Sequence, residues 1–137
     1  MAEAIARRLL AERLGAEEED LPARGFRLVS AGTAAGHGGA ATEEAEQAVR
    51  KYGADLGRHA SQPVTVAMVE EADRVYVMTP RHKGVLVEWM PEHEGKIQLL
   101  DPKGRAIEDP IGGSAEVYRE CARHIHEALQ ERLKEIG

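Results

Sequence analysis

The chain has 137 residues, the length of one ordinary domain, and 42% of them are hydrophobic, enough to build a core. Its formal net charge of −6 and the lack of a basic stripe argue against nucleic acid as a main partner. The single cysteine excludes an intramolecular disulfide, and neither a membrane-spanning run nor a secretory signal pattern is present. We therefore expect a cytoplasmic protein with no nucleic-acid or membrane partner.

The first half of the chain is predicted to form two helices with a short strand between them. Apolar residues recur at helical spacing over residues 1–14, and Gly15 ends that helix. After an acidic connector, the apolar stretch at residues 26–29 predicts a strand that runs into a loop rich in Gly and Ala. Thr42 is the expected N-cap of a second helix that extends to about residue 52.

The second half continues the alternation of helices and strands. A short helical turn at residues 65–73 leads into residues 74–78, where β-branched and aromatic side chains predict a strand. A helix that stops at Pro91, a third strand at residues 96–100 and a last helix at residues 115–136 follow. This order predicts an α/β fold of the three-layer αβα type, with a short parallel sheet of three strands and helices on both faces.

The loop before the last helix carries the candidate catalytic group. Pro110 disfavours a helical conformation at Asp109 and holds it extended. Gly112 and Gly113 allow a close approach of the backbone, and Ser114 is the expected N-cap of the last helix. A carboxyl group held in this way suits general acid catalysis if its site raises its pKa. The plainer alternative is a solvated aspartate in an ordinary loop.

The single cysteine is not expected to act as a nucleophile. Cys121 is predicted on the apolar face of the last helix, where burial raises the pKa of a thiol and lowers its reactivity. His124 and His126 are expected on the surface of the same helix, at a spacing that makes a poor metal pair. No metal site and no cofactor are predicted. The predicted apolar face consists of Val117, Cys121, Ile125, Leu129, Leu133 and Ile136.

Five short motifs follow one another along the chain: MAEA at residues 1–4, SAGT at 30–33, HASQPVT at 59–65, VMT at 77–79 and DPIGGS at 109–114. In this order and at this spacing they resemble the low-molecular-weight protein-tyrosine phosphatase family. Their details are closest to the bacterial branch, which includes protein-arginine phosphatases. The resemblance covers residues 1–137 and implies a phosphatase that acts on phosphoproteins, at phosphotyrosine or phosphoarginine.

The resemblance also implies roles for individual residues. Asp109 is implied as the general acid that protonates the leaving group. Ser30 and His59 match positions that support the phosphate-binding loop by hydrogen bonding. Ile111 stands where other branches place an aromatic wall of the substrate cleft, and Gln62 replaces an arginine that is common at its position.

The nucleophile loop of the family does not occur in these 137 residues. In the family, a strand and a Cys-x5-Arg loop followed by Ser-Pro come directly before the MAEA helix. The sixth residue after Cys121 is Glu127, so Cys121 does not begin such a motif. Phosphoryl transfer needs an activated nucleophile and an array of donors around the phosphoryl oxygens. We therefore predict a phosphatase-like domain that is N-terminally truncated relative to the family and inactive by itself.

Three functions remain open at this point. The chain is a family phosphatase without its catalytic loop, a non-catalytic pseudophosphatase that binds a partner or itself, or a relative of arsenate reductases, which would need resolving cysteines that this chain lacks.

The missing strand is the central one of the family's sheet. Its absence predicts either a rearranged three-stranded sheet or a homodimer that pairs exposed sheet edges.

Overall fold

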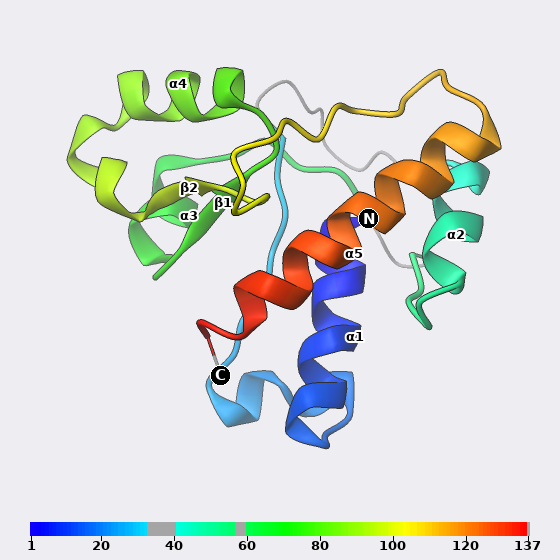
Figure 1. Ribbon diagram of the computed structural model, residues 1–137. Coiled ribbons are helices and arrows are strands. Elements are labelled where there is room, and N and C mark those ends of the chain that lie inside the picture. Colours follow the sequence, from blue (N-terminus) through cyan, green and yellow to red (C-terminus); the bar gives the residue numbers. More distant parts are fainter. Residues whose placement is uncertain (33–40, 57–59, 137) are drawn as a thin grey trace.

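The computed structural model describes residues 1–32, 41–56 and 60–136. The chain runs from α1 at the N-terminus to α5 at the C-terminus (Figure 1). None of the helices in these ranges is both long enough and apolar enough to cross a membrane. The elements, in chain order, are α1 (Ala2–Leu14), η1 (Glu18–Asp20), η2 (Pro22–Arg24), α2 (Glu43–Arg50), α3 (Val66–Glu71), β1 (Val75–Val77), α4 (Pro80–Trp89), η3 (Pro91–Lys96), β2 (Ile97–Leu99) and α5 (Ala115–Leu133), where η denotes a 3-10 helix.

The two strands pair in parallel, and helices cover both faces of the small sheet. Val75 lies opposite Ile97 and Val77 opposite Leu99, with α4 forming the crossover between the strands. Val77 packs with residues of α3 and α4, whereas the next residue, Met78, packs against the core formed with α1 and α5. Successive residues therefore face opposite layers, as the pleat of a strand requires. The predicted three-layer αβα class is confirmed (Figure 1).

The predicted strand at residues 26–29 does not form, so the sheet of the described residues has two strands rather than three. The backbone N–H of Phe26 donates to Leu21, and the carbonyl of Leu28 accepts a 3.0 Å hydrogen bond from the Arg7 side chain. A single parallel bridge, between Gly32 and Pro63, follows this segment. Apolar composition favours a strand, but a strand forms only where a neighbouring strand binds its backbone.

Hydroxyl side chains define the starts of four helices. The side-chain oxygens of Thr42, Thr65, Thr79 and Ser114 each accept a hydrogen bond from the backbone N–H three residues later, at 3.1–3.3 Å. Each bond satisfies one of the N–H groups that a helix leaves without an internal partner. The N-caps predicted at Thr42 and Ser114 are confirmed.

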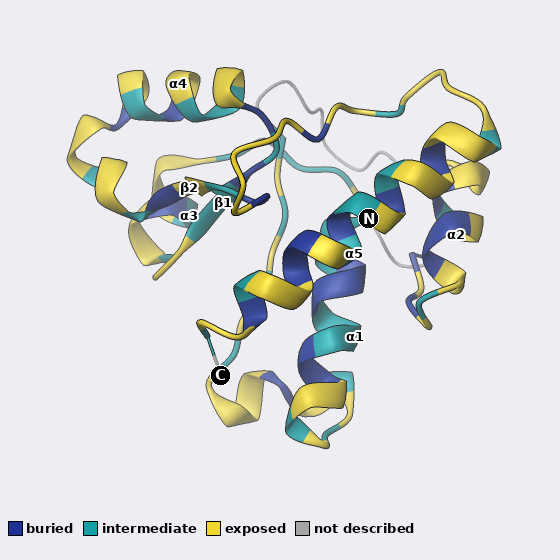
Figure 2. Ribbon diagram, in the orientation of Figure 1, coloured by how far each residue is buried: buried dark blue, intermediate teal, exposed yellow. Residues whose placement is uncertain are grey.

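The largest part of the core lies between α1, α2 and α5 (Figure 2). Ile5 on α1 and Ala122 on α5 are completely buried. The predicted apolar face of α5 is partly wrong, because Val117 is 48% exposed and Cys121 is only half-buried. The prediction is confirmed for Ile125, Leu129 and Leu133. Toward the start of the helix, Tyr118 and Ala122 face the core in place of Val117 and Cys121, and Ala128 is also buried.

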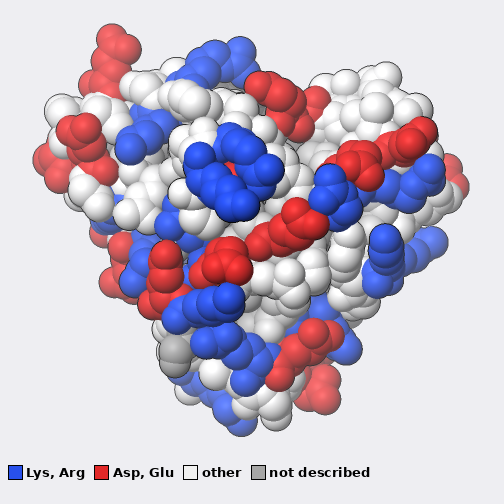
Figure 3. Space-filling model, viewed as in Figure 1, with Lys and Arg blue, Asp and Glu red and all other residues white. Residues whose placement is uncertain are grey.

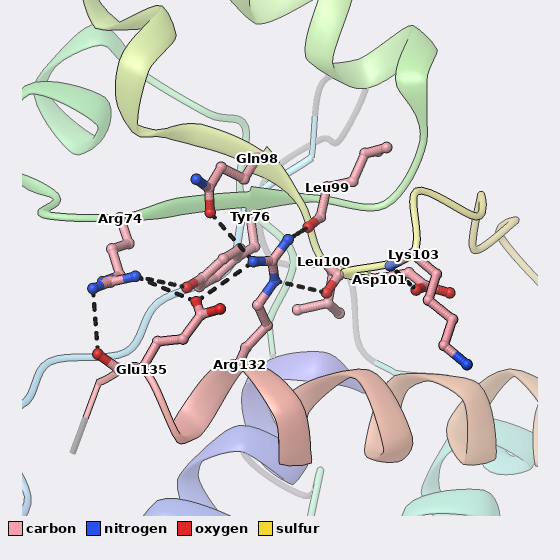
Figure 4. Close-up of polar contacts among 9 residues, drawn as sticks. All are labelled: Arg74, Tyr76, Gln98, Leu99, Leu100, Asp101, Lys103, Arg132 and Glu135. Carbon is pink, nitrogen blue, oxygen red and sulfur yellow. Dashed lines mark hydrogen bonds and ion pairs between the residues drawn. The ribbon is translucent and has the colours of Figure 1, made fainter.

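Arg132 ties the C-terminal half of α5 to the end of β2 (Figure 4). Its guanidinium group donates to the carbonyl oxygens of Leu99 and Leu100, and it lies 5.1 Å from the ring centre of Tyr76. A planar cation with several donors can bind two carbonyls and stack on a ring at the same time. This side chain therefore links α5 to the end of β2, where the loop that leads to α5 begins.

Candidate functional site

The candidate site lies beyond the carboxyl ends of the two parallel strands. We define the acid loop as residues 101–113, the segment between β2 and the N-cap of α5. Its middle is fixed to the sheet by a 2.8 Å hydrogen bond from the N–H of Ile107 to the carbonyl of Met78, and the Ile107 side chain is buried. In parallel α/β sheets this edge is where ligands bind.

Asp109 is held by a tight turn at the far end of the acid loop. The N–H of Ile111 donates to its Oδ1 at 3.0 Å, and the N–H of Gly113 donates to the Pro110 carbonyl at 2.8 Å. Gly112 has a φ of +80°, which favours glycine. A Cβ atom at Gly113 would lie 2.8 Å from the Pro110 oxygen, so this position has no room for a side chain. Asp109 is exposed on the turn and Ile111 beside it is 74% exposed.

The charge of Asp109 acts on the amine at the N-terminal end of α1 and on the nearby thiol of Cys121. Burial lowers the pKa of the Met1 amine, while the charges of Cys121, Glu3 and Asp109 oppose that shift. Burial raises the pKa of the Cys121 thiol, and the nearby amine and the Asp109 carboxylate act on it in opposite directions. The acid loop therefore faces the end of α1, where unpaired N–H groups favour an anion.

Cys121 lies beneath the acid loop. Its thiol donates a long hydrogen bond, 3.7 Å, to the carbonyl of Glu108. Beside this contact is a shallow, open pocket of about 260 Å³ between the loop and α5. The raised pKa of the thiol has the direction expected from the sequence, and it keeps Cys121 protonated at neutral pH. The pocket is lined by Ile107, Glu108, Val117, Glu120, Cys121, Arg123 and His124.

Ser30 also lies at the first turn of α1. Its hydroxyl donates to the Glu3 carboxylate at 3.1 Å, and the other oxygen of Glu3 pairs with Arg7 at 3.2 Å. The side-chain amide of Gln62 donates to the Ser30 carbonyl at 2.9 Å. The structure thus brings Ser30 and Asp109 to the same end of one helix. His59 lies outside the described residues.

A buried carboxylate at the start of the acid loop was missed by the sequence analysis. Asp101 is 2% exposed, and its Oδ2 lies 2.6 Å from Nε2 of His124 and 2.7 Å from Nε of Arg105. Its Oδ1 accepts from the backbone N–H of Lys103 at 2.7 Å (Figure 4). Burial alone would raise the pKa of this carboxyl group, but the hydrogen bonds outweigh burial and lower the pKa to about 2.

The expectation that His124 is a surface residue is therefore wrong: its imidazole is partly buried against Asp101. The signal in the sequence was the run from Asp101 to Gly104, which is a turn after a strand. Nothing in the sequence indicated that His124, 23 residues away, would bind Asp101. Within the described residues, no group of three or more His, Cys, Asp or Glu side chains is arranged to hold a metal ion.

Fold and site together define a three-layer α/β protein whose candidate acid lies at the carboxyl edge of its parallel sheet. All of residues 1–137 match the family model described as low molecular weight phosphotyrosine protein phosphatase. The protein-arginine-phosphatase of Geobacillus stearothermophilus is 34% identical over 123 residues, 87% of this chain and 80% of that protein. The protein-arginine-phosphatase of Bacillus subtilis is 29% identical over 111 residues, 78% of this chain and 73% of that protein.

Solved structures agree with this assignment. A low molecular weight protein tyrosine phosphatase from T. tengcongensis has a TM-score of 0.82 and 28% identity, with 98% of this chain and 88% of that chain covered. A mutant of YwlE from Bacillus subtilis has a TM-score of 0.81 and 29% identity, with 98% and 87% covered. The chain belongs to the low molecular weight phosphotyrosine protein phosphatase family.

Proposed function

We propose that this fold serves the hydrolysis of phosphoproteins, at phosphoarginine or phosphotyrosine, with Asp109 as the general acid. The observation that carries the proposal is the setting of Asp109: the turn at residues 109–113 holds its carboxyl group, and its charge acts on the amine at the start of α1. A group placed there can protonate a leaving group while the helix end favours the phosphoryl anion. The names of the two similar arginine phosphatases support phosphoarginine as the first substrate to test.

The other residues implied by the resemblance have supporting roles in this proposal. Ser30 lies at the first turn of α1 and is the candidate that steadies a phosphate-binding loop placed before that helix, together with His59. Ile111 is the candidate wall of the substrate cleft because its side chain is exposed beside Asp109. In the reaction, the thiolate of the family's Cys-x5-Arg loop attacks phosphorus. Asp109 gives its proton to the leaving group as the bond to phosphorus breaks, and water then hydrolyses the phosphocysteine.

The proposal includes that residues 1–137 by themselves do not turn over phosphate esters. They hold one thiol, Cys121, whose pKa is raised by burial and which donates to a backbone carbonyl. A protonated thiol is a poor nucleophile.

The cytoplasmic location expected from the sequence also remains part of the proposal, supported by the single unpaired cysteine.

The test compares residues 1–137 with the same residues preceded by a strand and a Cys-x5-Arg-Ser-Pro loop. Both are assayed with an aryl phosphate, a phosphotyrosine peptide and a phosphoarginine peptide. We expect turnover only with the added loop. We expect Asp109→Asn to lower that turnover by about 100-fold or more, the usual contribution of general acid catalysis. Asp73→Asn is the matched control and should change little. Asp73 is an exposed acid that lies before the N-terminal end of β1, at the edge of the sheet opposite to the acid loop.

Two results would contradict the proposal. Turnover by residues 1–137 alone that Asp109→Asn abolishes would show that these residues already hold a nucleophile. Full activity of the loop-bearing form carrying Asp109→Asn would show that another group is the acid. The ratio of the rates on the two peptides assigns the phosphorylated residue.

The second candidate function is self-association through the sheet, as a non-catalytic module. The observation that favours it is the small sheet: β1 pairs with β2, and in the unpaired segment at residues 26–29 Val29 is 56% exposed. Unpaired strand edges can pair with a second chain. Sedimentation equilibrium tests this candidate, which predicts a dimer that Val29→Lys weakens; a monomer at the highest concentration tested excludes it.

A further inference from the structure

We propose that Asp101, Arg105 and His124 form a clamp that positions the acid loop against α5. By holding the acid loop, the clamp would also position Asp109 for catalysis. This part of the inference rests on the proposed function, because it assumes that Asp109 is the general acid. The clamp itself does not depend on that assumption. It is defined by the two hydrogen bonds to Oδ2 of Asp101, 2.6 Å from His124 and 2.7 Å from Arg105.

Asp101 is suited to this role because its carboxylate is buried and bound on both oxygens. Oδ1 accepts from the Lys103 N–H, and the Asp101 carbonyl accepts from the Gly104 N–H at 2.9 Å, so the first turn of the acid loop closes on this residue. Oδ2 is shared between a side chain of the loop and a side chain of α5. A buried carboxylate with charge-assisted bonds is a stronger anchor than an exposed ion pair.

The acid loop makes two polar contacts with α5 before it reaches Asp109. The first is Asp101 with His124, and the second is the carbonyl of Glu108 with the thiol of Cys121, close to one helical turn away on the same helix. The open pocket of about 260 Å³ lies beside both contacts. Loss of the first contact leaves the stretch that leads to Asp109 held by the buried Ile107, by the bond from its N–H to Met78, and by the long bond to Cys121.

Arg123, the neighbour of His124, does not provide a substitute contact. Its guanidinium group is tied to Glu120 and Glu127 on the exposed side of α5, at 2.9 Å each. Figure 3 shows acidic and basic side chains interspersed on this face of the molecule. The clamp therefore depends on the histidine, which faces the loop, and not on the arginine beside it.

The chain's only thiol gives a direct measurement of the clamp. Cys121 lies beneath Glu108, so opening of the loop exposes its sulfur to an alkylating reagent. We expect His124→Leu and Asp101→Asn to raise the rate of Cys121 alkylation by N-ethylmaleimide about tenfold or more under native conditions, the effect of losing one charge-assisted hydrogen bond. We expect faster hydrogen exchange at the N–H groups of Ile111 and Gly113 in the same variants.

Two comparisons separate positioning from general stability. His124→Gln keeps an N–H donor near the position of Nε2, so it should restore the slow alkylation that His124→Leu loses. Thr65→Ala removes the N-cap of α3 and destabilises the fold without touching the loop, so it should leave both readouts unchanged. Unchanged alkylation in His124→Leu would overturn the clamp, and so would an equal increase in Thr65→Ala. None of these readouts requires phosphatase activity.

Discussion

The hydroxyl group of Ser30 donates a 3.1 Å hydrogen bond to the carboxylate of Glu3. This bond joins the segment before the Gly- and Ala-rich stretch to the first turn of α1, and Arg7 reinforces it by pairing with Glu3 and by donating to the Leu28 carbonyl. The segment at residues 26–30 is thus held by side chains of a helix, where the sequence predicted backbone pairing in a sheet.

A double-mutant cycle on Ser30 and Glu3 measures this link. We expect Ser30→Ala to lower the free energy of unfolding by about 1 kcal/mol, because it removes one partly buried hydrogen bond. The coupling between Ser30→Ala and Glu3→Ala should be about 0.5–1.5 kcal/mol, measured by urea denaturation. Additive effects of the two substitutions would show that the two side chains do not interact in solution.

Replacement of Arg132 should destabilise the fold more than replacement of any exposed arginine of α5. We expect Arg132→Met to lower the free energy of unfolding by about 2 kcal/mol or more, because two carbonyl oxygens at the end of β2 lose a charged donor. Arg123→Met on the same helix removes only exposed ion pairs and should cost much less. If both substitutions lower the free energy of unfolding equally in urea denaturation, Arg132 does not tie α5 to the end of β2.

The stability contributed by Asp101 should disappear in acid. Its pKa is lowered from 3.8 to about 2 in the folded protein, so folding favours the charged form. A lowered carboxyl pKa stabilises the fold above the unfolded value, and this contribution is lost as the pH falls from about 4 to about 2. The shift corresponds to about 2 kcal/mol.

Asp101→Asn isolates this contribution. The difference in unfolding free energy between the unmodified chain and the variant should be largest at pH 5–7 and should shrink by about 2 kcal/mol towards pH 2. Thermal or urea unfolding across that range measures it. A difference that stays constant with pH would mean that the Asp101 carboxyl is not perturbed.

A side chain at Gly113 should distort the turn that holds Asp109. In Gly113→Ala the new Cβ would lie 2.8 Å from the Pro110 carbonyl oxygen and 3.0 Å from Val117, so we expect a loss of about 1–3 kcal/mol. Gly84→Ala is the matched control, since a Cβ there meets nothing within 4 Å and Gly84 lies inside α4. It should stabilise the protein by up to about 1 kcal/mol. Similar melting temperatures for both variants would contradict the crowding at Gly113.

The helices were predictable because their signals are local. The N-cap at Thr42 and the N-cap at Ser114 each need only a hydroxyl group and the backbone three residues later. The strand predicted at residues 26–29 was wrong for the opposite reason, because its formation depends on distant residues. Its apolar pattern permits a strand, but pairing depends on which backbone lies beside it, and here the Arg7 side chain binds the Leu28 carbonyl.

The candidate site divides in the same way. The turn at Asp109 follows from Pro110, Gly112 and Gly113, which are neighbours in the chain. The packing of the first turns of α5 was predicted one residue out of place, since helical spacing gives the width of an apolar face but leaves its rotation to the partners. Tyr118 therefore occupies the core, and Val117 does not.

By itself, the sequence determined the N-caps at Thr42 and Ser114 and the extended turn that carries Asp109, because each depends on residues within a few positions of one another. The order of helices and strands along the chain determined the parallel α/β class. Only the tertiary structure decided that His124 binds Asp101 and that Ser30 binds Glu3. Those contacts join residues more than 20 positions apart, and a hydrogen bond between distant residues forms only after packing has brought their elements together.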